Sequence, residues 1–357
     1  MRPFGRSFIP GPVDVHPDIL EATLQPYYFT FNERMQALLA EMQPGLRQLF
    51  GTSHIVFLSV SAASGLMEAA VRNGVRHRVL CVTGGYFGEL FARIAEGCGK
   101  EVIRAVVPLG QTLEADMLAR FLEGPEVDAV TLVHSESSTG ALAPLPDLAR
   151  VVRSKPDTLL LVDGVTSIGA MPMEMDAWGI DFLLTGSQKA LALPPGMALG
   201  AVSPRLVARA EAQHDRGFYL SATHLLNAAK RNFPLTTPAL PIIHALQRQL
   251  RRIDDTGGLA ARFARHTAMA TMMAQWAEAR PDLRILADRS RRSPTVTALE
   301  LRNGPRAAEV VKTLESRDWL IATGLSPLAK SVIRIGHMGD LEPSHLADLL
   351  HELETVL

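Results

Sequence analysis

The chain has 357 residues and a nearly even charge balance, with 36 lysines and arginines against 37 aspartates and glutamates. This balance argues against a nucleic-acid-binding protein, which usually carries a basic excess or a basic stripe. Hydrophobic residues make up 47% of the chain and charged residues 20%, which is enough apolar material for a sizeable core and excludes general disorder.

Apolar runs, cysteines and lysines narrow the possibilities further. The sequence has no long apolar run and no leader-like start, so we expect neither a membrane span nor a signal peptide. Two cysteines, Cys81 and Cys98, cannot form a disulfide framework, which favours the cytoplasm. Any chemistry that needs a lysine has six candidates. They are Lys100, Lys155, Lys189, Lys230, Lys312 and Lys330.

Short apolar runs alternate with helical patterns from residue 55 to residue 202. Each run is continuously apolar, as expected for a strand that is buried on both faces. The predicted strands are 55–60, 79–82, 102–107, 127–133, 158–162, 180–184 and 197–202. Helices are predicted at 64–72, 88–96, 113–122 and 145–152. This alternation predicts βαβ units, and therefore an α/β fold with a mostly parallel sheet covered by helices.

The pattern changes after residue 204. Residues 204–277 are predominantly helical, with a proline-rich interruption at 234–241. Strands are then predicted at 295–301, 320–322 and 332–335, with helices at 306–316 and from Pro343 onward. We therefore predict an N-terminal arm over 1–20, a large domain over 21–255 and a smaller C-terminal α+β domain over 256–357.

Chemically informative residues follow the predicted strands directly. Ligands of parallel sheets bind beyond the carboxyl ends of the strands. Ser61-Ala62-Ala63-Ser64-Gly65 opens a helix and suits an anion, although small residues are common at such turns. Phe87 follows the next strand, where a core aromatic is the simpler interpretation of one ring alone. Asp163 follows the strand predicted at 158–162. Lys189 lies beyond the strand predicted at 180–184, where desolvation would lower the pKa of its amine.

Together these residues are the set that pyridoxal phosphate needs: an anion site, a stacking ring, a carboxylate for the pyridine nitrogen and a Schiff-base lysine. The chain resembles the class V, fold-type-I pyridoxal-phosphate aminotransferases, and within them the alanine–glyoxylate and serine–pyruvate group. The resemblance covers nearly the whole chain. It rests on Pro10-Gly11-Pro12, His134-Ser135-Glu136-Ser137-Ser138-Thr139-Gly140, Asp163-Gly164-Val165-Thr166-Ser167, Gly186-Ser187-Gln188-Lys189-Ala190-Leu191 and Ile333-Arg334-Ile335-Gly336.

The resemblance assigns a role to each matching position. It implies catalytic roles for Lys189, as the Schiff-base lysine, and for Asp163, as the partner of the pyridinium. The implied cofactor-binding residues are Ala62, Ala63, Ser64, Phe87, Ser137, Asp163, Gln188, Lys189 and Thr237, the last reaching the phosphate of a neighbouring subunit. Arg334 and Gly11 are implied on the substrate side, with Arg334 gripping a carboxylate. No His, Cys or carboxylate group has metal-ligand spacing, so we expect no metal site.

The sequence departs from the family pattern at two sites that bear on ligands. Ala62-Ala63 stands where relatives usually have Ser-Gly, so backbone N–H groups and Ser64 are left to bind the phosphate. Phe29-Thr30-Phe31-Asn32-Glu33-Arg34 replaces the usual Gly-His-Arg segment, which lies near the substrate in the family. The departure therefore bears on substrate identity more than on the chemistry.

The function implied is the transfer of an amino group from a small amino acid, of the alanine or serine type, to a 2-oxo acid such as glyoxylate or pyruvate. A homodimer with shared active sites is also implied. The rivals on the same scaffold are a 2-aminoethylphosphonate aminotransferase and a pyridoxamine aminotransferase. From another class, the chain could be a non-catalytic protein that binds pyridoxal phosphate.

Overall fold

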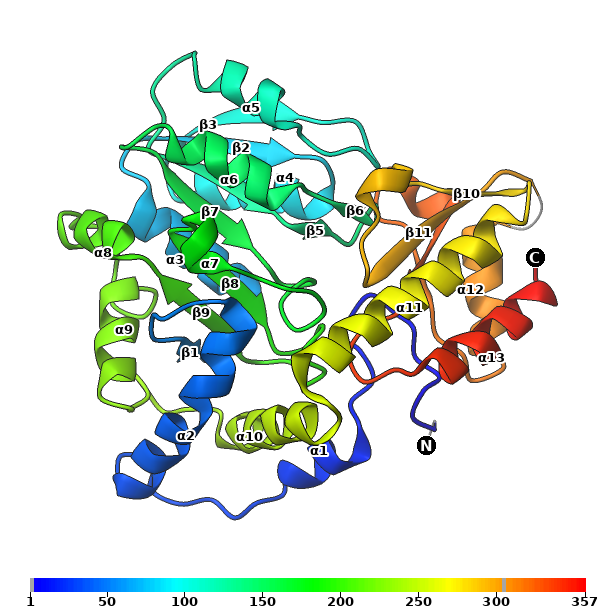
Figure 1. Cartoon of the computed structure of the whole chain (residues 1–357), viewed down its shortest axis with the longest axis horizontal. Coiled ribbons are helices and arrows are strands. Elements are labelled where there is room, and N and C mark those ends of the chain that lie inside the picture. The colour runs from blue at the N-terminus through cyan, green and yellow to red at the C-terminus, as the bar shows by residue number, and fades with distance from the viewer. Residues whose placement is uncertain (1–2, 304–305) are drawn as a thin grey trace.

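The computed structural model describes residues 3–303 and 306–357, so Met1 and Arg2 of the predicted N-terminal arm lie outside the described residues. Figure 1 shows a large sheet with helices packed around it and a smaller sheet near the C-terminus. Within the described residues, no helix is both long enough and apolar enough to cross a bilayer.

The large sheet has seven strands in the order β1-β9-β8-β7-β4-β2-β3. These are β1 (Phe57–Ser59), β2 (Arg78–Thr83), β3 (Glu101–Val106), β4 (Ala129–Val133), β7 (Leu159–Asp163), β8 (Phe182–Gly186) and β9 (Ala198–Val202). All neighbours from β8 to β3 pair in parallel, whereas β9 is antiparallel to both β8 and β1. The predicted mostly parallel α/β sheet is therefore confirmed, with one reversed strand that the run pattern does not reveal.

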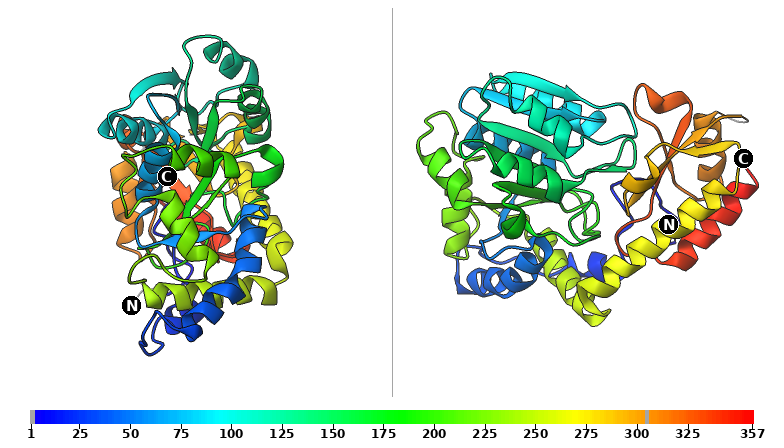
Figure 2. Two further views of the ribbon diagram at one scale, coloured as in Figure 1. Left: turned by 90° about the vertical axis from the view of Figure 1, so that its left-hand side faces the viewer. Right: turned by 45° about the horizontal axis from the view of Figure 1, so that its top comes forward.

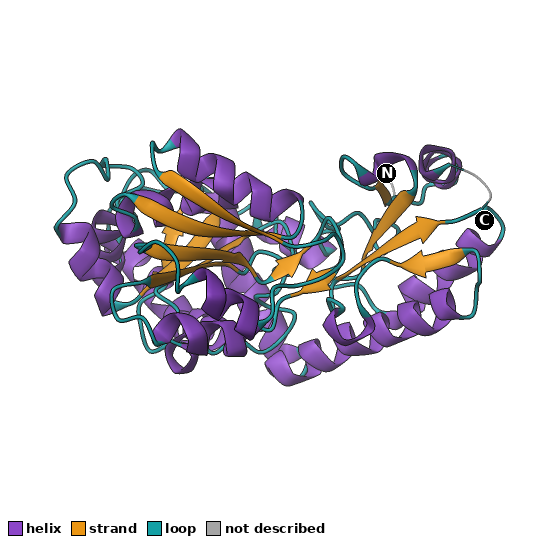
Figure 3. Cartoon of the chain, turned by 90° about the horizontal axis from the view of Figure 1, so that it is seen from above, coloured by secondary structure: helices purple, strands orange, loops and turns teal. Residues whose placement is uncertain are grey.

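Helices cover both faces of this sheet, as the view from above shows (Figure 3). One face packs against α3 (Ala63–Gly74), α4 (Tyr86–Gly97), α8 (Pro204–Glu211) and α9 (Ala222–Lys230). The other packs against α2 (Glu33–Phe50), α5 (Ala115–Phe121), α6 (Leu145–Arg153), α7 (Met175–Trp178) and α10 (Leu240–Asp255). The double burial explains the continuous apolar runs of the strands.

Three helices, α1 (Pro17–Ala22), α2 and α7, have no counterpart among the predicted elements. A proline such as Pro44 usually argues against a helix, yet α2 continues through it and has a well-defined cap at each end. The Asn32 side chain accepts a hydrogen bond from the Met35 N–H at the start, and Gly51 adopts a left-handed conformation with φ 58° at the end. The atypical segment 29–34 thus forms the entry to α2.

The smaller sheet has the order β10-β11-β13-β12 and is antiparallel throughout. Its strands are β10 (Leu283–Ile285), β11 (Val296–Leu301), β12 (Ala322–Thr323) and β13 (Val332–Gly336). Its helices are α11 (Gly258–Glu278), α12 (Ala307–Glu315) and α13 (Pro343–Glu354), and α11 and α13 run side by side (Figure 2). Short elements complete the chain: β5 (Ser135–Glu136), β6 (Ala141–Leu142) and two single 3-10 turns at 289–291 and 328–330.

The N-terminal arm joins the smaller sheet before it reaches the large one. Phe8 is fully buried in the core formed by α11, α12 and α13. Its N–H donates to the Leu320 carbonyl at 2.7 Å, and its carbonyl accepts from the Gly336 N–H at 2.6 Å. The strand predicted at 320–322 is displaced, because Leu320 pairs with the arm and β12 starts at Ala322. The division at 255/256 coincides with the break between α10 and α11 and stays a prediction.

Candidate functional site

The carboxyl ends of the parallel strands bring together most of the residues that the sequence singles out. Phe87 lies in the first turn of α4, directly after β2, and Asp163 is the last residue of β7. Lys189 follows β8, and Arg334 comes from β13 of the smaller sheet. Charges on Asp163 and Arg334 both act on the pKa of Lys189, so the two sheets contribute to one site.

Lys189 lies at the centre of this cluster. Its Nζ donates a hydrogen bond to the Pro10 carbonyl and lies 5.7 Å from the centroid of the Phe87 ring. Burial lowers the pKa of Lys189 to about 8, with Arg334 acting in the same direction. About a tenth of the amine is therefore unprotonated at neutral pH, far more than at its ordinary pKa of 10.5, and this favours its action as a nucleophile.

Asp163 is 4% exposed, and its Oδ1 accepts from the Val165 N–H at 2.8 Å. Burial raises the pKa of Asp163 to about 7; the Glu136 carboxylate acts in the same direction, whereas the Val165 hydrogen bond and the charge of Lys189 act against it. A buried carboxylate in this state favours a cationic N–H partner. The role predicted for Asp163, as the partner of a protonated ring nitrogen, stays a prediction.

Two residues of the predicted anion cradle, Ala63 and Gln188, lie beside Gly186. A Cβ built on Gly186 would lie 2.7 Å from the Gln188 Oε1 and 3.3 Å from the Ala63 Cβ, so both residues border the same small space. Ala62 is the N-cap of α3, and no side-chain hydrogen bond caps this helix. Ser64 lies exposed in the first turn. The first N–H groups of a twelve-residue helix therefore remain for an anion.

Arg334 is 8% exposed and is oriented by two backbone carbonyls. Its Nε donates to Thr323 at 2.9 Å and its Nη1 to Ser137 at 3.2 Å. Burial lowers the pKa of Arg334, but an arginine remains charged in proteins. Ser137 is thereby brought to the site through its carbonyl, while the role predicted for its hydroxyl stays a prediction.

Gly11 lies directly against the catalytic lysine candidate. Its φ is +113°, and a Cβ built there would lie 2.5 Å from Lys189 Cδ. The substrate role predicted for Gly11 stays a prediction, whereas its close approach to Lys189 is a feature of the chain itself. Pro10 stands out in the sequence only as part of a motif, and nothing in that motif indicates that its carbonyl accepts from Lys189.

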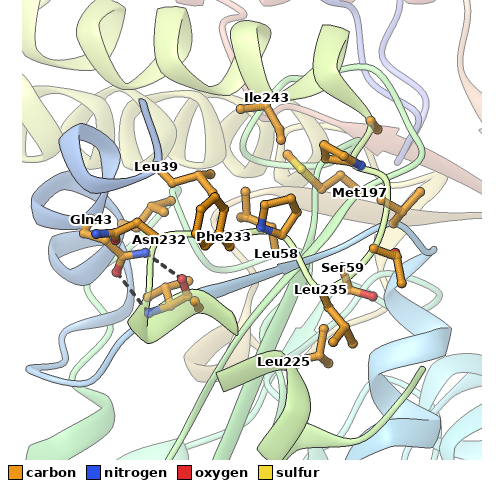
Figure 4. A pocket seen from close by; sticks show the side chains of 18 of the residues that line it. Leu39, Gln43, Leu58, Ser59, Met197, Leu225, Asn232, Phe233, Leu235 and Ile243 are labelled. Carbon is orange, nitrogen blue, oxygen red and sulfur yellow. Dashed lines mark hydrogen bonds between the residues drawn. The ribbon is translucent and has the colours of Figure 1, made fainter. Parts of the chain in front are cut away.

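Thr237 is not brought to this cluster within one chain. It is exposed in the segment between α9 and α10, as a residue that serves a neighbouring subunit would be. The adjoining residues border an apolar pocket whose lining includes Leu39, Phe233 and Ile243 (Figure 4). Neither Lys189 nor Arg334 lines this pocket, so it is distinct from the candidate site.

Two histidines near the strand ends serve as packing residues. The ring of His134 is 2% exposed, with Nδ1 3.0 Å from the Ser167 Oγ, and burial lowers the pKa of His134 to about 4. His337 is fully buried with Nε2 2.9 Å from the Thr297 Oγ1, and burial lowers its pKa to about 4 as well. Among residues 3–303 and 306–357, no group of three or more His, Cys, Asp or Glu is arranged to hold a metal ion.

Comparison with known proteins places the chain in a single family. Residues 27–337 match the family model for aminotransferase class V. The chain is 32% identical over 354 residues to L-aspartate–glyoxylate aminotransferase of Paracoccus denitrificans (94% of this chain, 86% of that protein). It is 29% identical over 349 residues to serine–glyoxylate aminotransferase of Methylorubrum extorquens (94% and 86%). The structure of alanine–glyoxylate aminotransferase from Nostoc sp. superposes with a TM-score of 0.93 at 29% identity (98% and 94%).

Proposed function

This chain belongs to the class V aminotransferases, and we propose that it uses pyridoxal phosphate on Lys189 to transfer an amino group from a small amino acid to glyoxylate. The observation that carries the proposal is the pairing of a lysine whose pKa is about 8 with a buried carboxylate, Asp163, at the same sheet edge. The alternative of a non-catalytic protein is disfavoured because Lys189, Asp163 and Arg334 are all intact.

The residues present fit pyridoxal phosphate. Asp163 would hold the pyridinium N–H, the Phe87 ring would pack on the flat face of the cofactor, and the α3 N-terminus with Gln188 would hold the phosphate. When bound, this cofactor supplies an electron sink that makes the α-carbon of an amino acid acidic. Lys189 would then move a proton to and from that carbon as general base and acid.

Arg334 supports a substrate with one carboxylate near the reacting carbon. Its guanidinium is oriented by two backbone carbonyls and lies close enough to Lys189 to lower the pKa of its amine. Among the described charged groups that act on Lys189, Arg334 is the one cation, and the others are Asp163 and Glu136. This arrangement favours alanine or serine over a dicarboxylic donor. Glyoxylate appears in the names of the three relatives reported above, one of which is an aspartate–glyoxylate aminotransferase.

A substrate panel tests this assignment. Purified protein loaded with pyridoxal phosphate is given alanine, serine, aspartate, 2-aminoethylphosphonate or pyridoxamine as donor, with glyoxylate or pyruvate as acceptor. We expect the highest kcat/KM with alanine or serine and glyoxylate. A preference for aspartate, pyridoxamine or the phosphonate would overturn the substrate assignment while leaving the family intact.

We also propose a homodimer in which Thr237 reaches the phosphate site of the partner. Several large apolar side chains are exposed beside the apolar pocket, including Phe29 (72%), Phe31 (44%) and Tyr219 (43%). Phe31 stacks on Phe233, which lines that pocket together with Tyr219. A second copy would cover this surface and complete both sites. Light scattering that shows a stable monomer with full activity would contradict the proposal.

The cytoplasm is our proposed location. Cys81 and Cys98 are both free, and Cys81 is fully buried in β2, where burial raises the pKa of its thiol to about 11. Free thiols persist in reducing compartments. Fractionation of the native cells followed by detection of the protein tests this location, and recovery from an oxidising compartment would contradict it.

A further inference from the structure

One acidic side chain in the site has no role in the proposed chemistry. Glu136 lies in β5, just after β4, and is only 6% exposed. Its Oε2 accepts from the backbone N–H groups of Phe87 and Gly88, both at 3.0 Å. Its Oε1 accepts from the N–H and the hydroxyl of Ser138, at 3.0 and 2.6 Å. Four hydrogen bonds thus fix one buried carboxylate.

These hydrogen bonds close the amino terminus of α4. A helix leaves its first N–H groups without intrahelical partners, and the N-cap of α4 is Gly85, which has no side chain to satisfy them. The N–H of Tyr86 donates to the Ser138 Oγ at 3.0 Å, and Glu136 takes the next two. The cap is therefore supplied by a segment about fifty residues away in the sequence. Because Glu136 accepts from the backbone N–H of Phe87, this cap also holds the backbone of Phe87 in place.

Gly85 is shaped by the same contact. A Cβ built on Gly85 would lie 2.5 Å from the Cγ of Glu136 and 2.5 Å from the Ser138 Oγ. Because φ at this position is 176°, the backbone would tolerate other residues, so the need for glycine comes from the close approach of Glu136.

The charge of Glu136 also acts on the pKa values of three groups in the site. Glu136 influences the pKa of Asp163 from β7, of Lys189 after β8 and of Arg334 from β13. It raises the pKa of the Lys189 amine, against the lowering effect of Arg334. The adjacent Ser137 supplies the carbonyl to which Arg334 donates. One short segment thus contacts both the ring-bearing helix and the carboxylate-binding arginine.

We propose that Glu136 is a positioning residue that holds the amino terminus of α4, and with it the Phe87 ring. The inference rests on the proposed function for its cofactor readouts. The contribution of Glu136 has a reach component and a charge component. The four hydrogen bonds need the full length of the side chain, whereas its effect on the pKa of Lys189 needs only its ionisation.

Two substitutions separate these components. Glu136→Gln keeps the length and removes the charge; its amide oxygen can still accept from the N–H groups of Phe87 and Gly88, whereas its NH2 group cannot accept from the Ser138 N–H. Glu136→Asp keeps the charge and withdraws the carboxylate by one methylene. Gly85→Ala displaces the unmodified Glu136 side chain and should resemble Glu136→Asp. The matched control is Glu89→Gln, which changes a glutamate within α4 that pairs with Arg104 at 3.0 Å and is 41% exposed.

The first measurement uses cofactor-free protein and follows amide hydrogen exchange of the segment that contains Phe87 and Gly88. We expect Glu136→Asp and Gly85→Ala to exchange at least roughly tenfold faster than wild type, and Glu89→Gln to match wild type. Unchanged exchange in both site variants, with the native fold verified by far-ultraviolet circular dichroism, would overturn the positioning role. This result holds whether or not the protein binds pyridoxal phosphate.

The second measurement follows the visible absorbance and circular dichroism of the bound cofactor against pH. Glu136→Gln should shift the absorbance midpoint to lower pH and keep most of the dichroism, whereas Glu136→Asp should keep the midpoint and lose dichroism. Equal midpoints in wild type and Glu136→Gln would overturn the charge component. A wild type that never binds the cofactor would instead refute the proposed function, and hydrogen exchange would still decide the role of Glu136.

Discussion

Gly11 and Lys189 are in such close contact that a single methyl group at Gly11 would lie 2.5 Å from the Cδ of the lysine. Gly11 also has a φ of +113°, a backbone conformation that L-residues with a side chain rarely adopt. The arm that carries Gly11 is fixed at Phe8 to the smaller sheet, and Pro10 accepts the hydrogen bond from Lys189. The position of the lysine therefore depends on the first dozen residues of the chain.

Gly11→Ala should disable catalysis. We expect kcat to fall on the order of 100-fold because a shift of about 1 Å in a reacting group has an effect of that size. Gly217→Ala is the matched control: Gly217 also has a positive φ, of 69°, but a Cβ there meets nothing within 4 Å. Steady-state kinetics on both variants checks this, and equal kcat values would show that Gly11 does not constrain the lysine.

Asp163→Asn should stabilise the cofactor-free protein at alkaline pH. The pKa of Asp163 is about 7 in the folded chain against an ordinary value of 3.8, so ionisation of the native carboxyl is unfavourable. Stability from this group is present below pH 3.8 and is lost as the pH rises through 7. The variant escapes that loss, which amounts to a few kcal/mol above pH 8 at about 1.4 kcal/mol per pKa unit.

Thermal unfolding from pH 5 to pH 9 measures this effect. The difference in Tm between Asp163→Asn and wild type should grow from pH 5 to about pH 8 and then level off, and the variant should bind pyridoxal phosphate more weakly than wild type. A difference in Tm that does not change with pH would mean that Asp163 is not protonated on folding.

Uptake of pyridoxal phosphate should accelerate as the pH rises through about 8, where burial places the pKa of Lys189. The unprotonated amine is the form that reacts with an aldehyde. Arg334→Gln should move this midpoint to higher pH, because the guanidinium lowers the pKa of Lys189. Stopped-flow absorbance measures both midpoints, and an uptake rate independent of pH between 6 and 9 would rule out Lys189 as the titrating group.

Asp340→Ala should strongly destabilise the junction between the two sheets. Asp340 is 3% exposed and accepts from the Arg262 Nη1 at 2.6 Å, while Arg262 also donates to the carbonyls of Gly169 and Ala190. Removal of one partner from a buried pair costs about 3–5 kcal/mol. Denaturant unfolding measures this cost. Glu354→Gln, which breaks an exposed pair with Arg280, is the control and should cost at most about 1 kcal/mol.

Residues next to strands were predictable, and contacts between distant segments were not. Asp163 and Lys189 follow continuous apolar runs, so their meeting at one sheet edge follows from the rule that parallel strands end together. The contact of Pro10 with Lys189 joins positions 179 apart, and no periodicity encodes it. The role of Glu136 depends on where α4 begins in space, which its own sequence neighbours do not specify.

The missed elements have equally local causes. Helix α2 contains Pro44, and a proline usually argues against a helix at its position. The reversed direction of β9 could not be predicted, because a buried apolar run has the same sequence pattern in a parallel and an antiparallel strand. Thr237 is exposed within one chain, and the role predicted for it would need a second copy.

The central claim is that Lys189, and not one of the other five lysines, carries the cofactor. Wild-type protein loaded with pyridoxal phosphate is reduced with borohydride, digested and analysed by mass spectrometry, beside Lys189→Ala and the control Lys155→Ala. We predict a cofactor adduct on the peptide that contains Lys189 in wild type and in Lys155→Ala, and none in Lys189→Ala. An adduct on another lysine, or a colourless wild type that takes up no cofactor, would contradict the account.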